Sequence, residues 1–109
     1  MISATFGRTG VRLAVAAMLS LYFSGAHAEE LKVTIDNFTF TPAELKVKVG
    51  DTVTWSNHDD IPHTVVSAGK FRSKAMDTDG TFSFTFTSAG DYKYFCSLHP
   101  HMTGMIKVE

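Results

Sequence analysis

Apolar and polar side chains alternate along most of the chain after residue 29. Thr34 separates Val33 from Ile35, and a single threonine likewise separates Val53 from Trp55. A period of two residues is typical of half-buried β-strands, because successive side chains of a strand point to opposite faces. This spacing, or a high content of β-branched residues, predicts strands within residues 31–35, 45–49, 52–57, 63–67, 82–86, 92–94 and 104–108.

Turn sequences separate these segments at short intervals. Gly50-Asp51 and Ala89-Gly90 are two examples. Many short strands joined by frequent turns favour an all-β sandwich over an open sheet. No stretch of ten or more residues has the 3.6-residue apolar period of a helix, and residues 68–79 are predicted to form a loop that can include a helical turn. The aromatic residues at strand spacing are predicted to form the core: Trp55, Phe82, Phe84 and Phe86.

The first 28 residues have the pattern of a secretory signal peptide. Arg8 and Arg12 precede an apolar run over residues 13–23, and Ala26-His27-Ala28 fits a small-x-small cleavage site. The apolar run is short for a membrane span, so cleavage is favoured over an uncleaved N-terminal anchor. We expect residues 1–28 to be removed and residues 29–109 to form a single periplasmic domain with no membrane attachment.

Composition restricts the function of the predicted mature domain. Removing Arg8 and Arg12 changes the formal net charge from −1 to −3, which makes nucleic acid an improbable partner. Cys96 is the only cysteine, so no intramolecular disulfide can form. A lone thiol in an oxidising compartment needs a specific role. The candidates are metal ligation, nucleophilic catalysis, intermolecular pairing and inert burial.

Cys96, His99 and Met102 form a C-x2-H-x2-M motif between two predicted strands. A thiolate, an imidazole and a thioether on one tight loop can converge on one centre, and these soft and intermediate donors suit copper. A second imidazole is available from His63, which follows Pro62 at the start of a predicted strand. Two histidines and a cysteine in a plane, with a weak axial methionine, form the ligand set of a blue-copper site.

Other uses of these residues are less favoured. A structural zinc site would leave Met102 without a purpose, and a nucleophilic Cys-His pair would need a histidine that is better explained as a ligand or a surface residue. His58 and His101 are the two histidines that in principle can replace a ligand. His58 lies in a polar turn and His101 lies between Pro100 and Met102, so we expect both side chains to be exposed.

The chain resembles the cupredoxin family, and most closely its amicyanin and pseudoazurin branch. The resemblance covers nearly all of the predicted domain, and the residues that carry it are Phe40-Thr41-Pro42, Val49-Gly50-Asp51-Thr52-Val53-Thr54-Trp55, Pro62-His63-Thr64-Val65, residues 86–94 and the loop of residues 96–104. It implies a Greek-key β-sandwich with one type 1 copper ion at one end. The implied ligands are His63, Cys96, His99 and Met102.

The resemblance also implies a function. We expect a one-electron carrier that is not an enzyme, with copper delivery or storage as the alternative. Its redox donor and acceptor are expected to dock transiently near His99, on an apolar patch that includes Pro62, Leu98 and Pro100, and the carrier is expected to be a monomer. Thr64 is a departure, because many relatives have asparagine there to hold the cysteine loop; here we expect that clamp to be weaker or to be made by the shorter hydroxyl. The predicted domain is also shorter at its N-terminus than amicyanin, so the partner stays unassigned.

Overall fold

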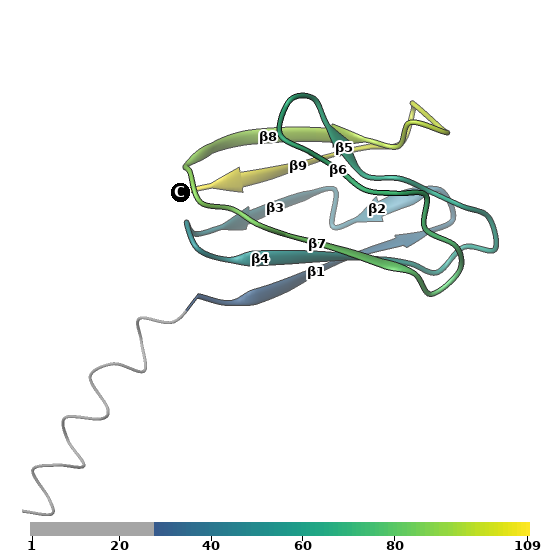
Figure 1. The fold of residues 1–109 in the computed structure, drawn as a ribbon, viewed down its shortest axis with the longest axis horizontal. Coiled ribbons are helices and arrows are strands. Elements are labelled where there is room, and N and C mark those ends of the chain that lie inside the picture. Colours follow the sequence, from purple (N-terminus) through teal and green to yellow (C-terminus); the bar gives the residue numbers. More distant parts are fainter. Residues whose placement is uncertain (1–27) are drawn as a thin grey trace, which may run out of the picture.

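The computed structural model describes residues 28–109, which form two β-sheets packed face to face (Figure 1). The predicted signal sequence lies almost entirely outside the described residues. Within them no helix is present, so none is long and apolar enough to cross a membrane. The strands in chain order are β1 (Glu30–Asp36), β2 (Thr39–Thr41), β3 (Glu44–Val47), β4 (Thr52–Asn57), β5 (Val66–Ser67), β6 (Phe71–Arg72), β7 (Thr81–Thr85), β8 (Gly90–Phe95) and β9 (Thr103–Val108).

One sheet has the order β2-β1-β4-β7 and the other has the order β3-β9-β8-β5-β6. The pairs β1/β4 and β3/β9 are parallel, and the other pairs are antiparallel. Neighbours in each sheet are thus often far apart in sequence, as in Greek-key sandwiches. The predicted all-β sandwich is confirmed.

The core lies between the two sheets, where the inward side chains of the alternating strands meet. Trp55 and Phe86 are fully buried, and the Trp55 ring packs against Tyr94 of the opposite sheet at a centroid distance of 5.4 Å. The other residues of this cluster with no exposed surface are Val33, Ile35, Val53, Val65, Cys96 and Ile106. Period-two alternation puts the strand residues of this cluster inside, because every second side chain of a strand points to the same face. Val65, Phe86 and Cys96 lie directly next to a strand end.

The structure differs from the sequence-based predictions in four details. Strand β3 ends at Val47, so Val49 is 49% exposed and does not continue the alternation. The segment 63–67 forms only the two-residue strand β5, while His63 makes an isolated bridge to Met76. The predicted loop 68–79 contains β6 and no helical turn. Phe82 and Phe84 are only partly buried, because the outer strand β7 has a single neighbour in its sheet.

Candidate metal centre

Two connections at one end of the sandwich supply the predicted ligands. Cys96 directly follows β8 and Met102 directly precedes β9, so both ends of their loop are fixed by paired strands. This loop lies at the end of the sandwich away from the C-terminus (Figure 1). His63 comes from the connection between β4 and β5, where its backbone N–H and C=O both bond to Met76.

Backbone hydrogen bonds make the β8–β9 loop compact. The amide of His99 donates to the carbonyl of Cys96 at 3.2 Å, and the amide of Met102 donates to the carbonyl of His99 at 2.9 Å. The amide of Cys96 in turn donates to the carbonyl of Met102 at 3.1 Å. Such successive bonds fold the short C-x2-H-x2-M segment back on itself, as its spacing predicts.

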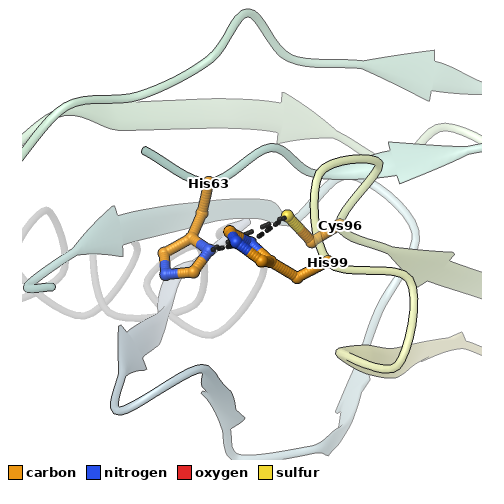
Figure 2. Close-up of side chains that lie close together, drawn as sticks. All are labelled: His63, Cys96 and His99. Atoms are coloured by element: carbon orange, nitrogen blue, oxygen red, sulfur yellow. Dashed lines mark hydrogen bonds between the residues drawn. The ribbon is translucent and has the colours of Figure 1, made fainter. Parts of the chain in front are cut away.

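Three predicted ligands point toward one another (Figure 2). The Sγ atom of Cys96 lies 3.7 Å from Nδ1 of His63 and 3.7 Å from Nδ1 of His99, and the two Nδ1 atoms are 3.2 Å apart. His63 and Cys96 are fully buried, whereas His99 is partly exposed. Met102, the fourth predicted ligand, is buried at the end of the same loop. His58 and His101 are exposed and lie outside this cluster.

Asp59 determines which nitrogen of His63 faces the cluster. Its Oδ2 atom accepts a hydrogen bond from Nε2 of His63 at 2.8 Å. A carboxylate only accepts, so Nε2 carries a proton and Nδ1 is the nitrogen of His63 that faces Cys96. Asp59 also accepts the amides of Asn37 and Phe38, and these bonds together outweigh burial and lower the pKa of the carboxyl.

The environment of Cys96 favours its thiolate. Burial alone would disfavour the charged form, but hydrogen bonds outweigh it and lower the pKa of Cys96 to about 6. The amide of Thr64 donates to Sγ at 3.3 Å, and His63, His99 and the hydroxyl of Thr64 contribute as well. A thiol with this pKa is mostly deprotonated near neutral pH, which is the form that binds metals. A thiolate and two imidazole lone pairs fit copper.

Several residues near the cluster, at the same end of the sandwich, were not identified from the sequence as parts of the site. Asn57 is fully buried, and its amide nitrogen donates to the carbonyls of Ile61 and Met76, which shapes the segment leading to His63. Asp59 contacts His63, and Phe38 contacts both His63 and His99. A polar turn was the only sequence signal for Asn57 and Asp59, and it gave no indication that their side chains face inward.

Comparison with known proteins places the chain in a family. Residues 27–109 match the family model described as copper binding proteins of the plastocyanin/azurin family. The chain belongs to this cupredoxin family. Amicyanin from Paracoccus denitrificans is 35% identical over 117 residues, which cover 99% of this chain and 89% of the relative. Chloroplastic plastocyanin from Tetradesmus obliquus is 31% identical over 88 residues, which cover 68% of this chain and 61% of the relative.

Solved structures support the assignment of the chain to the cupredoxin family. A Cu(I) structure of an amicyanin mutant has a TM-score of 0.71 at 37% identity and covers 73% of this chain and 82% of its own. A purple cupredoxin from Nitrosopumilus maritimus has a TM-score of 0.70 at 32% identity and covers 72% of this chain and 99% of its own. Copper is therefore the cofactor of this cupredoxin, and the protein is not an enzyme.

Proposed function

We propose that this cupredoxin is a one-electron carrier in which His63, Cys96, His99 and Met102 hold a single type 1 copper ion. The observation that supports the proposal is the convergence of two Nδ1 atoms and one Sγ atom within 4.8 Å of one another. When bound, copper supplies the one-electron chemistry by cycling between Cu(I) and Cu(II). Met102 would supply a weakly bound thioether, a ligand that tunes the potential of such sites.

The protein's own contribution is to hold these side chains still. Asp59 fixes the ring of His63, and the amide of Thr64 fixes the sulfur of Cys96. Both ligands are inaccessible to solvent, so water does not reorganise around them. A rigid and dry ligand set changes little between the two oxidation states, which favours electron transfer over release of the ion.

His99 is the proposed route for the electron. Its side chain is partly exposed, while those of His63 and Cys96 are not. Phe38, which is 46% exposed, packs against the ring of His99, and both chain neighbours of His99 are exposed, Leu98 at 51% and Pro100. Pro62, next to His63, is exposed as well. We infer that a redox donor and a redox acceptor dock here transiently, because apolar patches of this kind mark protein contacts.

The same proposal includes the cellular location and the oligomeric state of the protein. We infer that residues 1–28 are removed during export and that residues 29–109 work as a periplasmic monomer. Mass spectrometry of the protein purified from the periplasm tests the first point, since cleavage leaves Glu29 as the first residue. Sedimentation at micromolar concentration tests the second.

Electron carriage is separated from copper delivery by two measurements on the copper-loaded protein. Carriage predicts a reversible one-electron voltammogram and slow loss of copper to a competing chelator. Delivery predicts fast loss of copper without a reversible wave, and that result would overturn the proposal. The His101→Ala variant is the matched control, because the exposed His101 side chain lies outside the cluster and its removal leaves both properties unchanged.

A further inference from the structure

The turn between β1 and β2 contains a phenylalanine in an unusual backbone conformation. Asp36 pairs with Thr39, so Asn37 and Phe38 form a two-residue turn. Their φ angles are 52° and 59°, in the left-handed region. Asparagine accepts this region readily, but for a bulky residue it is strained, and glycine is favoured at the second position of such a turn. The fold therefore holds Phe38 in this conformation at a cost in free energy.

Asp59 holds Phe38 in this left-handed conformation. Its Oδ1 atom accepts the amide of Asn37 at 2.6 Å, and its Oδ2 atom accepts the amide of Phe38 at 2.9 Å. The same Oδ2 atom accepts Nε2 of His63 at 2.8 Å. One carboxylate thus joins the strained turn to a proposed copper ligand.

The strained conformation directs the ring of Phe38 onto the two histidines. Its centroid lies 5.2 Å from that of His63 and 5.0 Å from that of His99, at interplanar angles of 85° and 83°. These are edge-to-face contacts of the kind that aromatic rings prefer. Because the side chain stays 46% exposed, burial in the core does not explain why the strain is kept. Strained residues cluster where a site must be held in one geometry.

We propose that Phe38 is a positioning residue, whose ring locks the imidazoles of His63 and His99 in the orientation that faces Cys96. The same ring shields the outer face of His99 from solvent. The inference rests on the proposed function only in identifying the imidazoles as copper ligands. The ring contacts themselves involve the protein alone, so the first test needs no copper.

That test measures how fast each histidine of the apoprotein reacts with diethyl pyrocarbonate, by mass spectrometry. Phe38→Gly is the informative variant, because it removes the ring and the backbone strain together and gives the turn its favoured Asn-Gly sequence. We expect a several-fold faster reaction at His99 and no change at the exposed His58 and His101, which are internal controls. Phe38→Tyr keeps the ring and is expected to keep the wild-type rate.

A second readout uses the copper-loaded protein. Phe38→Gly is expected to lose copper to a chelator several-fold faster than the wild type, and Phe38→Tyr is expected to restore the slow rate. The inference would be overturned if His99 reacted equally fast in Phe38→Gly and in the wild type. It would also be overturned if Phe38→Tyr lost copper as fast as Phe38→Gly. A wild-type protein that binds copper without blue colour would instead refute the proposed ligand set and leave the apoprotein result standing.

Discussion

At the scale of single residues, the hydroxyl of Thr64 connects the two segments that supply the site. Thr64 is buried, and its Oγ1 atom accepts the amide of Ser97 at 2.7 Å and shares a hydrogen bond with Oγ of Ser97 at 2.8 Å. The expectation that a shorter hydroxyl can replace the asparagine of many relatives thus has a structural counterpart here. The Thr64 hydroxyl holds Ser97, the residue next to Cys96.

Replacing Thr64 by valine is expected to weaken this connection. Valine keeps the shape of threonine but leaves the Ser97 amide without its partner, and a typical intramolecular hydrogen bond contributes about 0.5–1.5 kcal/mol. Chemical denaturation of the apoprotein measures the free energy of unfolding. Thr64→Ser is the matched control and should stay close to the wild type. Equal stability of the valine and serine variants would contradict the role of the hydroxyl.

Three residues of the site could be predicted from the sequence, because their donor atoms and spacing are those of a metal site. The donor atoms of Cys96 and His99 converge because their spacing permits it on a short loop, and His63 joins them. Phe38 and Asp59 were missed because their roles depend on a left-handed turn and on a contact between segments 21 residues apart. No local pattern encodes such a contact.

At the scale of elements, the turn between β3 and β4 depends on one carboxylate. Asp51 accepts the amides of Lys48 and Glu29, each at 2.8 Å. These two bonds outweigh burial and, with the nearby positive charge of Lys48, lower the pKa of Asp51. The ionised carboxylate thereby joins the turn to Glu29, the residue directly before β1.

Asp51 is expected to make stability depend on pH in the acid range. A group whose pKa is lower in the folded state stabilises the protein above its unfolded pKa of about 3.9. That contribution is lost as the pH falls through the folded pKa. Unfolding midpoints of the apoprotein between neutral and strongly acidic pH should therefore fall less steeply in Asp51→Asn than in the wild type. Identical slopes would show that Asp51 has no such role.

The pairing of β8 with β9 requires a glycine at position 104. Tyr94 lies directly opposite Gly104 in the register, and a Cβ atom added to Gly104 would overlap the ring of Tyr94. Because that ring is buried in the core, it has little room to move. Gly104→Ala should lower the free energy of unfolding by roughly 1–3 kcal/mol, as overpacked cores do. Thermal denaturation measures this loss, and an unchanged midpoint would contradict it.

Strand boundaries show where sequence patterns stopped being informative. The alternation predicted β1 and β4 closely, because both strands have a buried face and an outer face. It failed at Val49, which follows the end of β3, and at β5, which is only two residues long. Short segments do not contain enough residues to define a period, and the partners that end a strand lie elsewhere in the chain.

At the scale of the whole molecule, copper is expected to stabilise the sandwich. The proposed ligands come from two separate connections, so the ion would bind the folded chain and not the unfolded one. Free copper at a hundred times the dissociation constant should add about 2.7 kcal/mol to the free energy of unfolding. Calorimetry with and without copper measures this gain. His63→Ala should lose most of it, and a full gain in that variant would exclude His63 as a ligand.

The central claim is that Cys96 and the two histidines bind copper as a type 1 site, and the visible absorption spectrum tests it most directly. Residues 29–109 loaded with one equivalent of Cu(II) should be intensely blue or green, because charge transfer from the Cys96 thiolate to copper absorbs visible light. Cys96→Ala should be colourless. A wild-type protein that binds its full equivalent of Cu(II) and stays colourless would contradict the account.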